Sequence, residues 1–370
     1  MRILLSNVSG HLHRSLQVKN KMVKKLVKGN VALCEGAIAA GLDAYFGYPI
    51  TPQNEVPAYM SKRMVELNKV FIQAESELAA ANMVLGACAT GKRAMTSSSS
   101  PGISLKQEAI SYMAGMEVPG VIVNVQRGGP GLGNIAGSQA DYFQAVKGGG
   151  HGDYRLIVYA PNCAQEMYEI TYNAFDVAQK YRNPVMLLCD GIIGQMMEPV
   201  DFNKELKTTF EKRDWILDGC KGREPRSLKS LLMEDGVLEK HNLDLQKKYK
   251  TIEDNEVKAE LYEVDDAEVI IVAYGISSRI SKNAIKQARA KGIKAGLIRP
   301  ITLWPFPSKI LSKYAKPSVK FLTVEFSLGQ MIEDVKLAIN GTSRVDFLGR
   351  AGGGIVSDKD VLNKIIELAK

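Results

Sequence analysis

The chain contains, at residues 75–102, the stretch ESELAAANMVLGACATGKRAMTSSSSPG. Its alanine-rich first part, residues 75–91, closes on a glycine, a residue type that commonly ends helices, so we predict a helix there. A short strand at residues 93–96, a polar run at residues 97–100 and a second helix beginning near Ile103 are predicted to follow. A helix, a strand and a hydroxyl-rich turn in close succession are typical of an α/β fold.

The same alternation continues on both sides of this stretch. Toward the N-terminus, the helical apolar spacing of residues 32–40 ends at Gly41 and is followed by a predicted strand at residues 44–48. Toward the C-terminus, apolar runs separated by helical segments predict three buried strands, at residues 118–125, 156–160 and 184–189. Successive strand–helix–strand units favour parallel pairing, so we expect a largely parallel sheet.

The composition divides the chain into further parts. Residues 201–266 hold 13 basic and 17 acidic residues in 66 positions, which indicates a charged connector between domains. We predict one helix in it near residues 239–250, anchored by Leu243, Leu245 and Tyr249. A second α/β unit then occupies residues 267–370. Its predicted elements are strands at residues 269–273, 295–298 and 320–324 and a first helix at residues 279–291.

Composition also excludes several classes of protein. With 370 residues, 45% of them hydrophobic, the chain can bury a real core, and no apolar run approaches the roughly 20 residues of a membrane span. The cysteines lack any CxxC pair, so we expect them to be reduced, buried small hydrophobes: Cys34, Cys88, Cys163, Cys189 and Cys220. The same spacing argues against a zinc or iron–sulfur site, so an electron carrier would lie on another chain.

The net charge of +8 lies almost entirely in a basic leader at residues 1–28, which holds seven basic and no acidic residues. The remainder is close to neutral and offers no basic patch for a nucleic acid. Because no secretory pattern precedes Met22, we interpret the leader as the product of a mis-assigned start codon. A disordered basic arm or an organelle-targeting peptide is the alternative. We expect a cytoplasmic protein that contacts neither nucleic acid nor membrane.

Four loops rich in glycine or hydroxyl groups are expected to follow strands, at residues 47–52 (GYPITP), 97–102 (SSSSPG), 127–133 (RGGPGLG) and 147–153 (KGGGHGD). In open parallel sheets ligands bind beyond the carboxyl ends of the strands, where such loops lie. The third loop differs from the GxGxxG of dinucleotide-binding proteins, and Pro130 lacks an amide that could point at a phosphate. Each loop alone is compatible with a surface turn, but four together indicate a ligand site.

Several segments together resemble the alpha-type subunit of 2-oxoacid:ferredoxin oxidoreductases, over roughly residues 28–370. They are residues 47–52, 73–77, 96–102, 126–130 and 139–141. Residues 48–55 and 148–155 are most similar to the branched-chain type, which acts on 3-methyl-2-oxobutanoate (2-oxoisovalerate). The resemblance implies oxidative decarboxylation of a 2-oxoacid, with transfer of the acyl group to coenzyme A and of two electrons to ferredoxin.

The resemblance also implies the fold. Residues 29–200 are expected to form a thiamine-diphosphate-binding, pyrimidine-domain fold built on a parallel sheet. The second unit, at residues 267–370, is similar to the transketolase C-terminal α/β domain, with turns at residues 299–307 and 325–330 that match it.

Two catalytic residues are implied by the match. Glu77 corresponds to the glutamate that hydrogen-bonds N1′ of the thiamine diphosphate aminopyrimidine and promotes its imino form, and Thr51 to a threonine that hydrogen-bonds the 2-oxoacid. A carboxyl among alanines is partly desolvated, which helps it keep or share a proton. Without the resemblance, Glu77 would be interpreted as an exposed residue at a helix start. Glu75 is expected to be its solvated neighbour.

The expected cofactor-binding residues are Pro49, Ile50, Glu77, Ser99 and Arg127. Family members that take 2-oxoglutarate have an arginine in the stretch that matches residues 131–139, and this chain has no cation there. A second substrate carboxylate would lack its bidentate partner, which favours an uncharged aliphatic substrate. Lys147 and His151 are candidates for binding the common carboxylate, and a structural role for His151 is equally compatible.

An absence in the sequence predicts partner subunits. Thiamine enzymes usually hold the diphosphate and its Mg²⁺ with a GDG motif followed by NN, and this chain has only a fragment, at residues 189–191. The resemblance implies that a beta-type subunit supplies this half, that iron–sulfur clusters lie on a delta-type subunit, and that a gamma-type subunit completes the complex. No metal ligand is expected in this chain.

Three alternatives stay open at this point. The chain could be the alpha subunit of a 2-oxoglutarate:ferredoxin oxidoreductase, or a non-catalytic scaffold subunit of a thiamine enzyme. It could also be half of a transketolase-like or sulfopyruvate-decarboxylase-like enzyme. The four histidines, two of them in the leader, disfavour a transketolase-like site for sugar phosphates.

Overall fold

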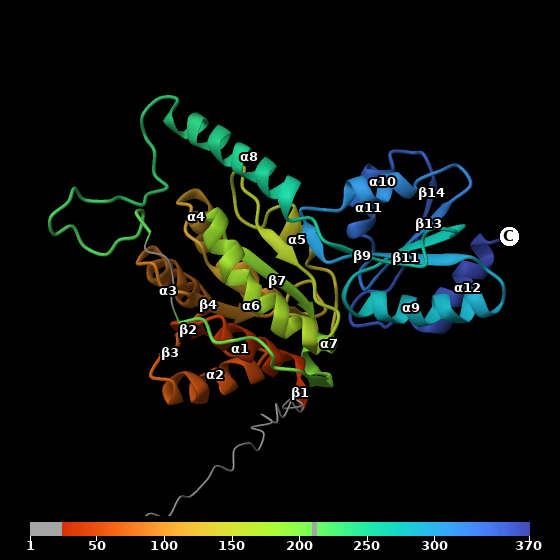
Figure 1. The fold of residues 1–370 in the computed structure, drawn as a ribbon, viewed down its shortest axis with the longest axis horizontal. Helices are drawn as coiled ribbons and strands as arrows, with labels where there is room; N and C mark the ends of the chain where they lie inside the picture. Colours follow the sequence, from red (N-terminus) through yellow and green to blue (C-terminus); the bar gives the residue numbers. More distant parts are fainter. Residues whose placement is uncertain (1–23, 209–212) are drawn as a thin grey trace, which may run out of the picture.

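The computed structural model describes residues 24–208 and 213–370 (Figure 1). These residues fold into two mainly parallel sheets with flanking helices and a two-stranded ribbon. Most of the basic leader, including Met22, lies outside the described residues. Its last part forms β1 (Lys25–Lys28), which pairs antiparallel with β8 (Met197–Val200).

Within the described residues, the first sheet has seven strands in the order β12-β6-β7-β5-β4-β2-β3. All neighbours are parallel except β12, which pairs antiparallel with β6, so the expectation of a largely parallel sheet is confirmed. The strands are β2 (Ala44–Gly47), β3 (Val70–Gln73), β4 (Ala94–Ser98), β5 (Val121–Gln126), β6 (Ile157–Tyr159), β7 (Val185–Asp190) and β12 (Thr302–Trp304).

The helices of this part are α1 (Gly29–Ala39), α2 (Glu55–Glu66), α3 (Glu77–Ala89), α4 (Ser100–Gly115), α5 (Tyr142–Val146), α6 (Ala164–Tyr181) and α7 (Gly191–Gln195). α1 packs closely along α6, since a β-carbon at Gly36 would lie 2.3 Å from the Tyr168 carbonyl oxygen. α4 begins at Ser100, not near Ile103 as predicted. Ser99 is extended and Pro101 lies in the first turn, where its missing amide costs nothing.

The second sheet, again counted within the described residues, has five strands in the order β14-β13-β10-β11-β9, with only β9 antiparallel. The strands are β9 (Ala259–Tyr262), β10 (Val269–Val272), β11 (Ala295–Pro300), β13 (Lys320–Glu325) and β14 (Arg344–Gly349). The helices are α9 (Gly275–Ala290), α10 (Ser308–Tyr314), α11 (Met331–Ile339) and α12 (Asp358–Leu368). The three strands and the first helix predicted here are confirmed.

The charged segment contains α8 (Val237–Asn255), which confirms the predicted helix and spans the upper side of the molecule in Figure 1. Leu245 and Tyr249 are buried as predicted, but Leu243 is 58% exposed. The reason is periodicity: Leu245, Tyr249 and Ile252 form one stripe at helical spacing, and Leu243 falls on a different face.

The cysteine prediction is only partly confirmed. All five are free, and Cys34, Cys88 and Cys189 are buried. Cys163 is half-buried because it caps α6, where its sulfur accepts a hydrogen bond from the Glu166 amide (3.5 Å). Cys220 is exposed because the charged segment around it has no core to enter.

Within residues 24–208 and 213–370, no helix combines the length and apolar character needed to cross a membrane.

A buried polar cluster joins the two sheets at their carboxyl ends. Asp190, at the end of β7, accepts hydrogen bonds from the amides of Ile193 in α7 (3.0 Å) and Ile276 in α9 (2.8 Å). Gln139 donates to the Tyr274 carbonyl (2.9 Å) and accepts from the Phe326 amide (3.0 Å). Burial raises the pKa of Asp190 from its ordinary 3.8 to about 6.

We expect Asp190→Asn to change how stability depends on pH. Between about pH 4 and 6, the folded chain retains a proton on Asp190 that the unfolded chain has released, because folding raises the pKa of Asp190 from 3.8 to about 6. The stability contributed by this proton is complete below about pH 4 and is lost as the pH rises through about 6. Asparagine does not titrate. The thermal midpoint of the wild type minus that of the variant should therefore fall as the pH rises from about 4 to about 6.

Thermal unfolding followed by circular dichroism measures this difference. Asp235→Asn, at an exposed aspartate, is the control and should show no such trend. A midpoint difference between wild type and Asp190→Asn that stays constant with pH would contradict the prediction.

Candidate active site

Glu77 is the first residue of α3 and is only 6% exposed, so it is not an exposed helix-start residue. The hydroxyl of Ser76 caps the helix by accepting from the Ala79 amide (3.2 Å), which fixes the first turn. Glu75 is exposed, as expected of a solvated neighbour.

The Glu77 side chain lies against the first turn of α4. A β-carbon at Gly102 would be 2.6 Å from Glu77 Oε1 and 2.1 Å from Ser98 Oγ, so only glycine leaves room for the carboxylate. In the part of the chain that the structure describes, no hydrogen bond is formed by this carboxylate. A buried carboxylate without a partner is available to a ligand.

Two further polar groups beside it are also free. The hydroxyls of Ser98 and Ser99 are fully buried and lack a hydrogen-bond partner among the described residues. The preceding hydroxyl, that of Ser97, is satisfied by Tyr45 (2.7 Å) and Gln53 (2.5 Å). Buried orphan hydroxyls are uncommon in proteins, so this pair marks a place where a polar ligand can bind.

Arg127 holds two of the predicted loops together. Its guanidinium donates to the carbonyl of Thr51 (2.9 Å) and to that of Leu132 (2.9 Å). The Thr51 hydroxyl accepts only from Asn54 (3.1 Å), and both Thr51 and the adjacent Ile50 are half-buried. Pro49 is exposed at the rim of the same loop.

Ser100 joins the second loop to the third. Its hydroxyl accepts from the Arg127 amide (3.0 Å) and donates to Asp141 (2.5 Å), which also accepts from Asn124 (2.8 Å). Burial raises the pKa of the Asp141 carboxyl. Three of the four loops therefore meet at the carboxyl ends of β2, β4 and β5, as expected for a ligand site in a parallel sheet.

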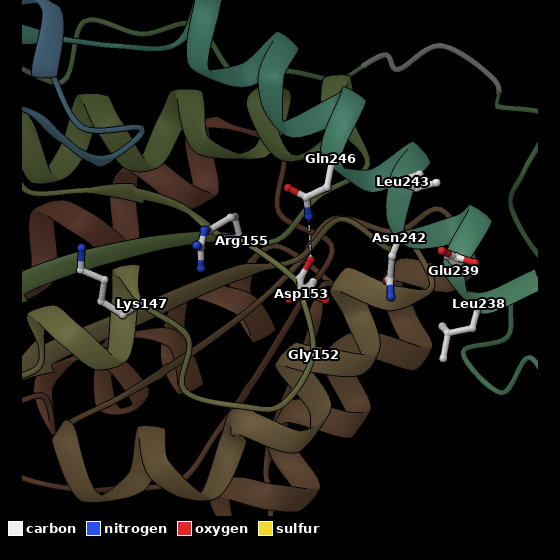
Figure 2. Close-up of a pocket in the computed structure, with 9 residues that line it drawn as sticks. All are labelled: Lys147, Gly152, Asp153, Arg155, Leu238, Glu239, Asn242, Leu243 and Gln246. Atoms are coloured by element: carbon white, nitrogen blue, oxygen red, sulfur yellow. Dashed lines mark hydrogen bonds between the residues drawn. The ribbon is translucent and has the colours of Figure 1, made fainter. Parts of the chain in front are cut away.

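The fourth loop, residues 147–153, does not follow a strand: it follows α5, so that expectation was wrong. Lys147 is paired with Asp334, and His151 is exposed. Figure 2 shows Lys147 beside a hollow of about 750 Å³ between this loop and α8, where Gln246 donates to the Asp153 carbonyl (3.1 Å). Neither this hollow nor the one lined by His151 includes Thr51, Glu77, Ser99 or Arg127.

Sequence reasoning placed Ser98 and Gly102 in a predicted ligand loop but assigned neither of them a role, and it missed Lys106 altogether. Ser98 and Gly102 lie in the quoted serine-rich stretch, and the signal that could have found them is its glycine next to four hydroxyls. In the described residues, no group of three or more His, Cys, Asp or Glu side chains is placed to hold a metal ion.

The fold and the site define a thiamine-diphosphate-binding domain followed by a second α/β domain. Residues 35–260 match the family described as pyruvate flavodoxin/ferredoxin oxidoreductase, thiamine diphosphate-binding. Residues 267–361 match pyruvate:ferredoxin oxidoreductase core domain II. The chain therefore belongs to the pyruvate flavodoxin/ferredoxin oxidoreductase family, and the predicted resemblance to 2-oxoacid:ferredoxin oxidoreductases is confirmed.

Two curated relatives cover nearly the whole chain. The ketoisovalerate oxidoreductase subunit VorB of Methanothermobacter marburgensis is 51% identical over 348 residues, which are 94% of this chain and 99% of that protein. The 2-oxoglutarate synthase subunit KorA of the same organism is 36% identical over 368 residues, covering 92% and 98%.

Solved structures agree on the fold. A 2-oxoglutarate:ferredoxin oxidoreductase from Magnetococcus marinus, with 2-oxoglutarate, coenzyme A and succinyl-CoA bound, superposes with a TM-score of 0.83 at 25% identity. The match covers 94% of this chain but 65% of that one. A split-gene transketolase, an inactive beta4 tetramer, has a TM-score of 0.57 at 14% identity over 93% of this chain and 98% of its own, and supports the fold alone.

We expect Gly102→Ala to weaken thiamine diphosphate binding by roughly tenfold, as for the loss of one hydrogen bond to a charged group. The added methyl would displace both Glu77 Oε1 and Ser98 Oγ. Isothermal titration calorimetry on the complex with its partner subunits measures the affinity. Gly86→Ala is the matched control, because a β-carbon there meets no atom within 4 Å. Equal affinity in the two variants would contradict the prediction.

Proposed function

We propose that this chain is the subunit that binds the pyrimidine end of thiamine diphosphate in a coenzyme A-dependent 3-methyl-2-oxobutanoate:ferredoxin oxidoreductase. The observation that carries the proposal is the buried Glu77 carboxylate, free of hydrogen bonds in the described residues and framed by Gly102 and the orphan hydroxyls of Ser98 and Ser99. The relative at 51% identity is named for ketoisovalerate, the same 2-oxoacid.

The residues fit an aminopyrimidine. Such a ring presents nitrogen atoms that act as donors and acceptors along its edge, and a carboxylate beside buried hydroxyls offers complementary groups. Glu77 would hold or share a proton at N1′, and Ser99 would meet the polar edge of the ring. Pro49 and Ile50 would contribute apolar contact from the neighbouring loop, and Arg127 would keep that loop in place.

Thiamine diphosphate, when bound, supplies the nucleophile and the electron sink for decarboxylation of a 2-oxoacid. The chain's own contribution is to orient the ring, to exclude water around Glu77 and to present Thr51 to the substrate oxo group. The Thr51 hydroxyl can still donate, since in the described residues it only accepts, from Asn54. Thr51 is therefore the residue that we assign to substrate binding.

The remaining parts of the enzyme are assigned to other subunits. We propose that a beta-type subunit supplies the diphosphate and Mg²⁺ site, and that a ferredoxin-like delta-type subunit holds the iron–sulfur clusters that reduce ferredoxin. A gamma-type subunit would complete the complex. The absence of a GDG…NN pattern from the sequence and the name of the related chains, which are subunits, support this division. We also propose a cytoplasmic location, because the five cysteines are free, as is usual in a reducing compartment.

The third loop supports an aliphatic substrate. Arg127 is the only cation in residues 126–140, and both of its terminal nitrogens are engaged by backbone carbonyls. Leu132 and Ile135 in the same loop are 80% and 66% exposed and can receive an apolar group. A second carboxylate, as in 2-oxoglutarate, would meet no free cation in this loop.

We expect the assembled enzyme to prefer 3-methyl-2-oxobutanoate over 2-oxoglutarate by at least about tenfold in kcat/KM, because an unpaired carboxylate costs more than 1 kcal/mol to desolvate. Coenzyme A-dependent reduction of a viologen dye by the co-expressed subunits measures both rates, with pyruvate as a third substrate. A preference for 2-oxoglutarate would overturn the substrate assignment and favour the function of the 36% identical relative.

We expect Glu77→Gln to reduce kcat by about 100-fold or more, the usual loss when a general acid–base group is removed. Glutamine keeps the shape of the side chain but cannot exchange the proton. Glu75→Gln, at the exposed neighbour, is the matched control and should leave the rate unchanged. If Glu77→Gln retains full activity, the chain is a scaffold subunit and the catalytic assignment fails.

A further inference from the structure

A lysine lies buried beneath the candidate site. Lys106 is in α4, one turn after Gly102, and no part of its side chain is exposed. Its ammonium group donates to the hydroxyl of Thr96 on β4 (2.7 Å) and, over 3.4 Å, to the backbone carbonyl of Glu77. Positions four apart lie on one face of a helix, so the face of α4 that accommodates the Glu77 carboxylate also presents this lysine to it.

A buried lysine at this place is costly for the fold. Within residues 24–208 and 213–370, Lys106 forms no salt bridge with a carboxylate at contact distance, and its hydrogen-bond acceptors are one hydroxyl and one carbonyl. Burial lowers the pKa of Lys106 from its ordinary 10.5 to about 7, and the charge of Glu77 opposes that change. An apolar residue of similar volume would fill the space at lower cost.

The groups that face the amine are few. From α3 it meets Glu77, whose charge raises the pKa of the amine, and from β4 it meets the non-ionisable Thr96. The negative charge of Glu77 therefore favours the charged form of Lys106.

We propose that Lys106 is a positioning residue for Glu77: it anchors the first turn of α3 and places a titratable positive charge beside the Glu77 carboxylate. This inference rests on the function proposed above. A charged Lys106 attracts the Glu77 carboxylate, and a neutral Lys106 leaves that carboxylate without a counter-charge. Proton exchange on thiamine diphosphate binding should consequently depend on pH near neutrality.

The test measures protons directly, apart from turnover. Thiamine diphosphate with Mg²⁺ is titrated calorimetrically into the co-expressed complex at a series of pH values, in two buffers of different ionisation enthalpy. In the wild type, the number of protons exchanged should change around pH 7. Lys106→Met should abolish that change, because methionine has no titrating amine.

Two further variants separate charge from structure. Lys106→Arg keeps a permanent charge, so we expect affinity near that of the wild type but no change in proton exchange around pH 7. Lys248→Met is the matched control and should behave as the wild type. Lys248 is another lysine whose pKa burial lowers, but its partners are Glu117 and the Arg182 carbonyl.

The outcomes are distinct. If Lys106→Met lowers the thermal midpoint but keeps wild-type proton exchange and pH dependence, Lys106 is structural and the inference is overturned. If that variant does not assemble, Lys106→Arg and Thr96→Val decide by the same measurement, since loss of the Thr96 hydroxyl should also alter the profile. If Glu77→Gln keeps wild-type proton exchange, the proposed function fails together with the inference. If Glu77→Gln alters proton exchange but Lys106→Met behaves as the wild type, only the inference is overturned.

Discussion

The fold depends on a buried carboxylate, that of Asp190, which accepts hydrogen bonds from the first turns of two helices in different domains. Burial of this group would be unfavourable without those amides, so α7 and α9 must lie where they do. Gln139 completes the junction by pairing with the backbone beside β10 and β13. The carboxyl ends of both sheets are thereby fixed relative to each other, and the loops of the candidate site, which emerge from the first sheet, acquire a rigid base.

On that base, hydrogen bonds satisfy most of the polar groups of the site and leave a few free. Arg127 uses its terminal nitrogens to hold two loops, and Ser100 joins the second loop to the third through Asp141. Among the groups left without a hydrogen-bond partner in the described residues are the Glu77 carboxylate and the hydroxyls of Ser98 and Ser99. Preorganisation of this kind lowers the entropy cost of binding a ligand, because the loops need not be ordered when it arrives.

Much of this architecture could be predicted from sequence, because the buried strands β5 and β7 are mostly apolar runs bounded by turn residues. Strands β3, β9 and β14 were missed because they lie at sheet edges and are partly exposed, which weakens their apolar pattern, and β3 and β9 are also short. Glu77 was identified by resemblance, since its local pattern predicts a solvated helix start. Its burial arises from Gly102, which is 25 positions further on, and sequence periodicity does not record such a contact.

The burial of Lys106 could not be predicted from the local sequence either. The surrounding sequence SLKQE has the polar pattern of a solvent-facing helix surface, yet Lys106 and Gln107 are both buried. β4 is unusual in a related way, because its end is a run of three buried hydroxyls, those of Thr96, Ser97 and Ser98. Around the Glu77 carboxylate, local sequence rules that favour an apolar core are broken on adjacent elements. Natural proteins retain such costly exceptions chiefly where function requires them, and the clustering therefore supports the proposed site at the junction of α3, β4 and α4.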